Sequence, residues 1–296
     1  MKILLTGKNG QVGFELQRSL APLGEIIAVD MADCDLSNPD AIRKLVRDIK
    51  PQIIVNPAAY TAVDKAESDQ DIAYAVNGIA PGIFGEEARG IGALVIHYST
   101  DYVFDGRKAG AYDENDLPNP QSVYGKSKLQ GEQALQHSGA DYLIFRTSWV
   151  FGAHGGNFPK TILKLAADRE YLNVVADQIG SPTSAALIAD VTAQIVCQYT
   201  KRRERVRFSF GIYHLVAAGE TNWCEYAKTV IRAAHTAGKN LKLNPEAIKP
   251  ITSAEYPVPA PRPANSLLDT GKLRSTFGLG LPAWQSGLTH VLQLIL

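Results

Sequence analysis

The chain has 296 residues, of which 45% are hydrophobic and 20% are charged, ordinary values for a globular protein. Its 30 lysine and arginine residues balance 30 aspartate and glutamate residues, so no overall charge favours nucleic acid or an anionic membrane as a partner. No uncharged apolar run approaches the ~18 residues of a membrane span. Cys34, Cys197 and Cys224 are widely spaced, which argues against a disulfide framework and predicts a reducing cytoplasm. The opening residues, MKILLTG, enter an apolar strand directly and leave no room for a signal peptide.

The first half of the sequence alternates short apolar runs with amphipathic segments of helical length. Strands are expected at residues 2–7, 25–30, 51–60, 93–100 and 141–150, and helices at residues 11–23, 38–50, 72–90 and 123–132. Glycines and Pro81 weaken the expectation that residues 72–90 form one continuous helix. Apolar runs without polar alternation are typical of strands that are covered on both faces. The regular succession of strand and helix predicts an α/β fold with a doubly wound parallel Rossmann sheet.

After residue 150 the pattern is less regular. Helices are expected at residues 157–169, 182–199 and 222–238, and short strands at residues 171–176 and 211–216. Residues 256–266, YPVPAPRPANS, are too rich in proline for regular structure. We expect residues 1–150 to form the Rossmann domain, with part of residues 157–200 packing on it, and residues 151–296 to form mainly a smaller C-terminal α/β domain that binds substrate. The basic run KRRER, residues 201–205, lacks interleaved aromatic residues and predicts a solvated loop.

A glycine-rich turn lies between the first expected strand and the first expected helix, where TGKNGQVG supplies Gly7, Gly10 and Gly13. Glycine permits a tight turn, and N–H groups at a helix N-terminus can face a pyrophosphate. Asp30 closes the second expected strand, where a carboxylate accepts hydrogen bonds from the hydroxyls of an adenosine ribose. These residues predict a site for NADH or NADPH. Asp30 favours NADH because it repels a 2′-phosphate, unless a neighbouring cation offsets that repulsion.

Two further loops fit the same cofactor. Ala59 and its neighbour Ala58 leave room for a dinucleotide close to the backbone. Asp35 and Leu36 offer a polar and an apolar group to an adenine ring. Each of these residues would also suit ordinary packing.

The fourth expected strand ends in HYSTDYVFDG. Ligands of open parallel sheets bind beyond the carboxyl ends of the strands, so Ser99, Thr100 and Asp101 are expected to point into a cleft. His97 lies within the strand and is expected to be a core residue.

Tyr124 and Lys128 stand four residues apart in VYGKSKLQGE, directly after the polar loop DENDLPNPQS. On a helix this spacing brings two side chains to one face, about 5–6 Å apart. We expect the ammonium of Lys128 to draw the pKa of Tyr124 from its ordinary value near ~10 toward neutrality. Thr100 would hold a carbonyl oxygen of the substrate, and Tyr124 would protonate that oxygen as a hydride reaches the carbon. Outside a Rossmann context the pair would be read as two surface residues.

The segments TGKNGQVG, STDYVFDG, VYGKSK and FRTSWVFG resemble motifs of the extended short-chain dehydrogenase/reductase family. With RPANSLLDT near the end, they are most similar to the dTDP-4-dehydrorhamnose reductases within it, and the likeness covers nearly the whole chain. The resemblance implies NAD(P)H-dependent reduction of the C4 ketone of dTDP-4-dehydro-L-rhamnose, the last step in making dTDP-L-rhamnose for cell-surface polysaccharide.

The resemblance also assigns roles to residues by position. The implied catalytic residues are Thr100, Tyr124 and Lys128. The implied cofactor residues are Gly7, Gly10, Gln11, Val12, Asp30, Asp35, Leu36, Ala59, Tyr60, Thr61, Tyr98 and Lys128. The implied residues for the dTDP-sugar are Thr100, Asp101, Tyr124 and Trp149, with Arg262 as a candidate for the diphosphate. Trp149 would pack on the deoxysugar or else serve as a core residue between the domains.

The same family includes homodimers bridged by Mg²⁺ through acidic residues on two helices. Glu15 and Asp190 stand at such positions. Ala186 stands where a further acidic residue is expected, which argues against the metal-bridged homodimer. Glu15 and Asp190 would otherwise be solvated charges on helix surfaces.

Two other classes of function stay open. A dehydratase of this fold usually carries an acidic pair after the threonine, whereas Asp101 is followed here by Tyr102. An epimerase needs only the core residues and is harder to exclude. A non-catalytic regulatory subunit would bind nucleotide but would have no need for the Tyr124–Lys128 pair.

Overall fold

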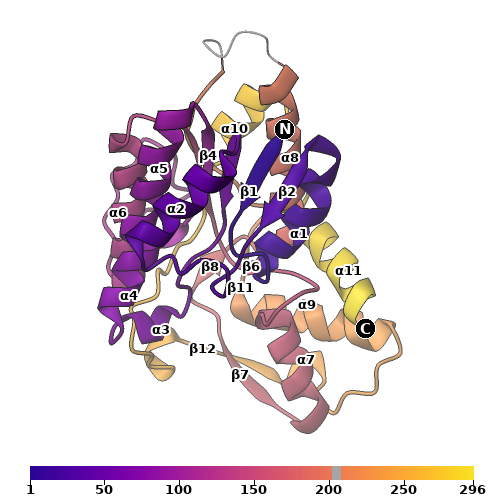
Figure 1. Ribbon diagram of the computed structural model, residues 1–296. Helices are drawn as coiled ribbons and strands as arrows, with labels where there is room; N and C mark the ends of the chain where they lie inside the picture. Colours follow the sequence, from indigo (N-terminus) through magenta and orange to yellow (C-terminus); the bar gives the residue numbers. More distant parts are fainter. Residues whose placement is uncertain (202–207) are drawn as a thin grey trace.

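The computed structural model describes residues 1–201 and 208–296. Within these residues, six strands form a sheet in which every neighbouring pair is parallel (Figure 1). The strand order is β10-β5-β4-β3-β1-β2. The strands are β1 (Lys2–Leu5), β2 (Glu25–Ala28), β3 (Ile53–Asn56), β4 (Leu94–Thr100), β5 (Asp141–Thr147) and β10 (Gly211–His214).

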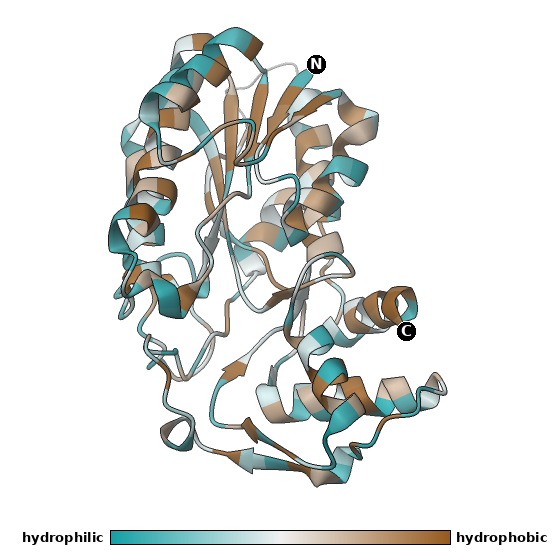
Figure 2. Ribbon diagram, turned by 60° about the horizontal axis from the view of Figure 1, so that its bottom comes forward, coloured by the Kyte–Doolittle hydropathy of each residue, from teal (hydrophilic) through white to brown (hydrophobic). Residues whose placement is uncertain are grey.

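Helices cover both faces of the sheet (Figure 1). One face packs against α2 (Pro39–Ile49), α5 (Ala80–Ile91) and α6 (Val123–His137). The other packs against α1 (Gln11–Leu20), α8 (Ala185–Lys201) and α10 (Gly271–Phe277). The middle parts of the strands are mostly hydrophobic, as expected for strands with two covered faces (Figure 2). The predicted doubly wound α/β fold is therefore confirmed.

The sixth strand of the sheet corrects one expectation. Residues 211–216 were assigned to the smaller region, but β10 pairs with β5, with Ile212 opposite Ile144 and Tyr213 opposite Phe145. The preceding helix, α8, packs on α1. The chain therefore returns to the large sheet after residue 184, and its C-terminal half contributes to both regions.

The smaller region has its own hydrophobic core. Its main elements are α7 (Phe158–Asp168), β7 (Leu172–Val175), α9 (Trp223–Thr236), β12 (Ile248–Ile251) and α11 (Trp284–Ile295). β7 and β12 pair in parallel below the large sheet (Figure 1). Four two-residue strands connect the regions: β6 (Val150–Phe151), β8 (Ile179–Gly180), β9 (Thr183–Ser184) and β11 (Thr221–Asn222).

The expected helix at residues 72–90 forms without a break but contains a π-helical turn. Two short helices, α3 (Val63–Ala66) and α4 (Gln70–Tyr74), precede a π-helical segment at residues 75–79 that continues into α5. The carbonyl oxygen of Asn77 in this segment lies 2.0 Å from where a Cβ on Gly131 would be, so α6 can approach only because residue 131 is glycine. The side chain of Asn77 donates to the Ser127 hydroxyl at 3.1 Å and accepts from the Tyr60 N–H at 2.8 Å.

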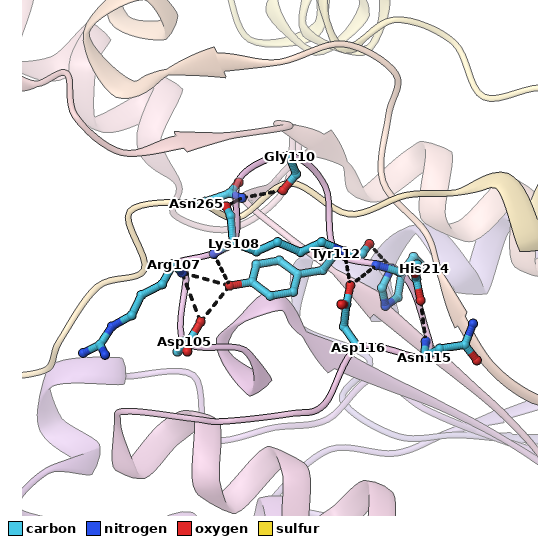
Figure 3. A network of polar contacts seen from close by, with 10 residues as sticks. Asp105, Arg107, Lys108, Gly110, Tyr112, Asn115, Asp116, His214 and Asn265 are labelled. Atoms are coloured by element: carbon cyan, nitrogen blue, oxygen red, sulfur yellow. Dashed lines mark hydrogen bonds and ion pairs between the residues drawn. The ribbon is translucent and has the colours of Figure 1, made fainter.

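A polar network fixes the loop after β4 to the C-terminal segment (Figure 3). The Tyr112 hydroxyl donates to Asp105 at 2.8 Å and accepts from the Arg107 N–H at 2.9 Å. The Asn265 amide donates to the carbonyls of Lys108 and Gly110. This loop, from Asp105 to Asp116, therefore forms a fixed wall beside the carboxyl ends of the strands.

Two further sequence features are located by the structure. Lys201 ends α8, and the rest of the basic run, residues 202–205, lies outside the described residues. Among residues 1–201 and 208–296, none of the helices combines the length and the apolar character that crossing a membrane requires.

Candidate active site

A cavity of about 680 Å³ opens at the carboxyl ends of the parallel strands. It brings together residues from the glycine-rich turn, the ends of β2 to β5 and the start of α6. The predicted residues that line it are Gly7, Gly10, Gln11, Val12, Asp30, Ala59, Thr61, Tyr98, Thr100, Asp101, Tyr124, Lys128 and Trp149. Most of the predicted site residues therefore line one cavity, although they come from segments far apart in the sequence.

The glycine-rich turn has the geometry of a phosphate cradle. Gly7 has a φ of 59°, and a Cβ on Gly13 would lie 2.0 Å from the Gly7 carbonyl oxygen. Gly10 caps α1 and has no side chain to cover the first N–H groups of the helix, which face the cavity. Beside them, the Asp30 carboxylate accepts the Asn9 N–H at 2.9 Å. These residues fit a bound dinucleotide, with the pyrophosphate on the turn and a ribose at Asp30.

The hydroxyls of Thr100 and Tyr124 face each other in the cavity wall. Thr100 donates to Asp101 at 3.0 Å, and its hydroxyl is near enough to Tyr124 to influence the pKa of the phenol. Burial raises the pKa of Tyr124 to about 12, although the Thr100 hydroxyl opposes the shift. The Asp101 carboxylate raises it further by like-charge repulsion. Tyr124 is therefore a protonated phenol at neutral pH.

Lys128 does not act on Tyr124 as the sequence analysis predicted. Its ammonium donates to the Tyr98 carbonyl at 2.6 Å and lies 3.2 Å from Nε2 of His97. Burial lowers the pKa of Lys128 to about 8, opposed by the charge of Glu132 one helical turn away. The predicted lowering of the Tyr124 pKa is wrong in this structure, because burial of the phenol outweighs any help from the neighbouring cation.

His97 links Lys128 to the interior of the sheet. Its Nδ1 lies 3.2 Å from the Asn56 amide nitrogen, and Asn56 accepts a hydrogen bond from the Thr6 hydroxyl at 2.6 Å. All of these side chains are buried. Burial and the Lys128 charge both hold the pKa of His97 well below its ordinary value, so the imidazole is neutral. The expectation that His97 is a core residue is confirmed.

Trp149 lies between the first cavity and a second one of about 420 Å³. It stacks on Trp223 with ring centroids 3.6 Å apart and an interplanar angle of 14°. Its φ of 48° is unusual for a large side chain and turns the ring toward both cavities. The second cavity is lined mainly by apolar side chains from α7, β7 and α9, with Gln178 and Asn173 among its polar residues.

Arg262 reaches the second cavity but not the first. Its guanidinium donates to Asp64 on α3 at 2.7 Å and to the Ala260 carbonyl at 3.2 Å. Asp64 also accepts the Ala260 N–H at 3.2 Å. The proline-rich segment is thus tied to the large region across the mouth of the cavity that Arg262 and Asp64 both line.

Three predicted cofactor residues lie outside the walls of these cavities. The Asp35 carboxylate accepts hydrogen bonds from the N–H and hydroxyl of Ser37. Leu36 packs against the core between the sheet and α2. The Tyr60 hydroxyl donates to Asp69 at 2.9 Å. Their binding roles stay predictions.

Glu15 and Asp190 come together, but around a cation of the protein itself. Arg18 contacts the Glu15 carboxylate at 3.3 Å and the Asp190 carboxylate at 3.0 Å. Ser19 also donates to Asp190 at 2.6 Å. Among the described residues no group of three or more His, Cys, Asp or Glu side chains could hold a metal ion. Within one chain these residues do not fit Mg²⁺, because Arg18 already pairs with both carboxylates.

The structure also adds residues that the sequence analysis did not assign. Thr147 is one of them: its buried hydroxyl lines the first cavity and has no hydrogen-bond partner among the described residues. The hydroxyl of Ser99, which was expected in the cleft, shares both properties. Tyr102 lines both cavities and packs edge-on against Tyr124, with centroids 5.5 Å apart. The sequence could have indicated Tyr102 as a cavity residue, because it belongs to STDYVFDG, the motif at the end of the fourth expected strand. Trp223 had no local signal, because its partner Trp149 lies far away in the sequence.

Comparison with known proteins places this geometry in a family. The RmlD substrate binding domain model matches residues 1–296. The dTDP-4-dehydrorhamnose reductase of Escherichia coli K12 is 49% identical over 99% of this chain and 97% of its own. The crystal structure of a dTDP-4-dehydrorhamnose reductase from Clostridium acetobutylicum is 36% identical, with a TM-score of 0.91 over 100% of this chain and 99% of its own. That of the Bacillus anthracis reductase in complex with NADP is 35% identical, with a TM-score of 0.89 over 98% of both chains. The chain therefore belongs to the RmlD substrate binding domain family.

Proposed function

We propose that this chain is an NAD(P)H-dependent reductase that converts the C4 ketone of dTDP-4-dehydro-L-rhamnose to the alcohol of dTDP-L-rhamnose. The observation that carries the proposal is the meeting of Thr100, Tyr124 and Lys128 in the wall of the cavity that also holds the glycine-rich turn. The curated relatives of that name match nearly the full chain at up to 49% identity. The product of such a reductase supplies rhamnose for cell-surface polysaccharide.

Each side chain has a role that its surroundings support. Thr100 and Tyr124 are placed to hold the ketone oxygen, and Tyr124 carries the proton that the oxygen needs, because its pKa is raised to about 12. When bound, the dihydronicotinamide supplies the hydride that the ketone carbon accepts. Tyr124 then regains its proton from water. Lys128, anchored on the Tyr98 carbonyl, is placed to hold the nicotinamide ribose.

The sugar nucleotide is proposed to occupy the second cavity. Trp149 and Trp223 offer aromatic faces to the base or the deoxysugar, and Gln178 offers an amide. Arg262 lines the same cavity and suits the diphosphate, because a guanidinium binds phosphate oxygens in pairs. Asp101 lines the first cavity beside Thr100 and Tyr102, and we place it near the reacting carbon.

The proposal also covers the choice of dinucleotide, the cellular location and the oligomeric state. Either NADH or NADPH fits the glycine-rich turn, and Asp30 favours NADH. The three cysteines are free, which suits a reducing cytoplasm. A homodimer stays a prediction, which light scattering on the purified protein checks.

The decisive experiment supplies enzymatically generated dTDP-4-dehydro-L-rhamnose with NADH or NADPH. A reductase consumes one dinucleotide per ketone, whereas an epimerase returns it unchanged. Tyr124→Phe is expected to lower kcat by roughly 10² or more, because it removes the proton donor. It should leave dinucleotide affinity near the wild-type value. Undiminished turnover by Tyr124→Phe would contradict the catalytic role of Tyr124. Undiminished biological activity of Tyr124→Phe, in a protein that shows no turnover of its own, would favour a regulatory subunit.

A further inference from the structure

A charge cluster sits behind the proposed ribose site, at the junction of the glycine-rich turn and the end of β2. The Lys8 ammonium forms an ion pair with the Asp33 carboxylate at 2.6 Å. Asp33 also accepts the backbone N–H of Asp30 at 2.9 Å. The Asp30 carboxylate in turn accepts the N–H groups of Asn9 and Met31 at 2.9 and 2.8 Å. Asp30 and Lys8 are thus held together by one network of hydrogen bonds.

This network determines which charged groups would lie near the 2′-phosphate of a bound NADPH. Asp30 lines the cavity and presents a carboxylate, which suits ribose hydroxyls and repels a phosphate. Lys8, on the glycine-rich turn, is the cation that belongs to this cluster, but its charge is already neutralised by Asp33. With Asp30, Asp33 and Lys8 counted together, the cluster carries a net charge of −1.

We propose that the Lys8–Asp33 ion pair sets the preference of this chain between the two nicotinamide dinucleotides, because Asp33 holds the ammonium that would otherwise bind the 2′-phosphate. The inference rests on the proposed function, since it concerns the cofactor of the same site. The two side chains are 32% and 43% exposed, so the ion pair is weak and imposes a penalty on NADPH rather than a block. A penalty of this kind corresponds to roughly threefold to tenfold in affinity.

The test measures dissociation constants of NADH and NADPH by calorimetry at low ionic strength, without sugar nucleotide. Asp33→Asn keeps an acceptor for the Asp30 N–H but frees Lys8. It is expected to tighten NADPH binding by roughly threefold to tenfold and to leave NADH within about twofold. The double variant Asp33→Asn with Lys8→Met is expected to lose this gain.

A matched control is Asp48→Asn, which breaks an exposed ion pair with Lys44 on α2 and removes one negative charge away from Asp30. It should leave the ratio of the two constants at the wild-type value. An unchanged ratio in Asp33→Asn would overturn the inference. So would a gain that survives in the double variant, because the carboxylate would then act by repulsion alone. Wild-type protein that binds neither dinucleotide would instead contradict the proposed function.

Discussion

Asp101, at the end of the parallel strand β4, has a carboxyl group whose pKa is raised by its surroundings. It is buried beside Thr100, and burial raises the pKa of its carboxyl to about 6, while hydrogen bonds from Ser266 and Thr100 oppose the shift. The folded protein therefore holds the proton of Asp101 more tightly than the unfolded chain, whose pKa is near 3.8. Stability from this group is complete below the unfolded pKa and is lost as the pH rises through about 6.

Asp101→Asn should remove this dependence on pH. The amide keeps the acceptor for Thr100 and never ionises, so the variant is expected to gain up to about 3 kcal/mol of unfolding free energy over wild type between pH 4 and pH 7. Urea denaturation at the two pH values measures it. Asp105→Asn is the control, because the pKa of Asp105 is lowered by hydrogen bonds and its effect has the opposite sign. Equal differences at both pH values would contradict the argument.

The direction in which Tyr124 and Lys128 point follows from the sequence, whereas their electrostatic surroundings do not. The spacing of Tyr124 and Lys128 correctly predicted that both would face the cavity, because spacing on a helix fixes the direction of a side chain. The direction of the Tyr124 pKa was predicted wrongly. Burial depends on every segment that covers the phenol, including Tyr102 and the end of β4, and no local pattern reports it.

At the scale of elements, the turn between β5 and β6 carries Trp149 in a left-handed backbone conformation. Such a conformation costs free energy for a bulky residue, so the surrounding structure must hold it in place. Trp223 stacks on one face of the indole, and a Cβ on Gly180 would lie 2.5 Å from the ring. The turn therefore presents a rigid aromatic surface between the two cavities.

Trp149→Phe tests this surface. The smaller ring loses part of the stack on Trp223 and part of the wall of the second cavity, so the KM for the sugar nucleotide is expected to rise about tenfold, the effect of ~1.4 kcal/mol of lost contact. Dinucleotide affinity should change little. Trp284→Phe, in the core of the smaller region and outside both cavities, should lower stability without raising KM. Equal KM values for the two variants would argue against a role for Trp149 in binding.

Strong local patterns predicted most elements, and the failures had long-range causes. Pro81 and its neighbouring glycines weakened the expectation of a continuous helix, but α4, the π-helical turn at residues 75–79 and α5 follow one another without a break. The π-helical turn packs against Gly131 of α6, a contact that no local pattern reports. The short run at residues 211–216 looked like other strands of the smaller region. Its place beside β5 is decided by the packing of α8 and α10, which a single apolar run does not encode.

Across the whole molecule, two hydrophobic cores are joined at the site by polar ties. Asp64 on α3 holds both Arg262 and the Ala260 N–H of the proline-rich segment. Asp177, after β7, forms a comparable tie to Ser253, after β12, but within the smaller region. Asp64 and Arg262 both line the second cavity, whereas Asp177 does not.

Asp64→Ala should therefore affect binding more than folding. Release of the segment is expected to raise the KM for the sugar nucleotide severalfold, while the dissociation constant of the dinucleotide stays near wild type. The free energy of unfolding should fall by only about 1 kcal/mol, as for a partly exposed ion pair. Asp177→Ala is the matched variant and should lower stability without raising KM. A lower KM in Asp64→Ala would mean that Asp64 restrains Arg262 instead of orienting its segment.

The late position of β10 has a consequence for synthesis of the chain. As the protein emerges from the ribosome, β5 is complete about 60 residues before its neighbour, and its outer edge presents unpaired N–H and C=O groups during that interval. Nascent chains crowded on one messenger RNA are thus open to pairing with each other through this edge. Slow translation between Thr147 and Gly211 would lengthen the time for which the edge of β5 is unpaired. The need for chaperones should therefore be greatest while this part of the chain is being synthesised.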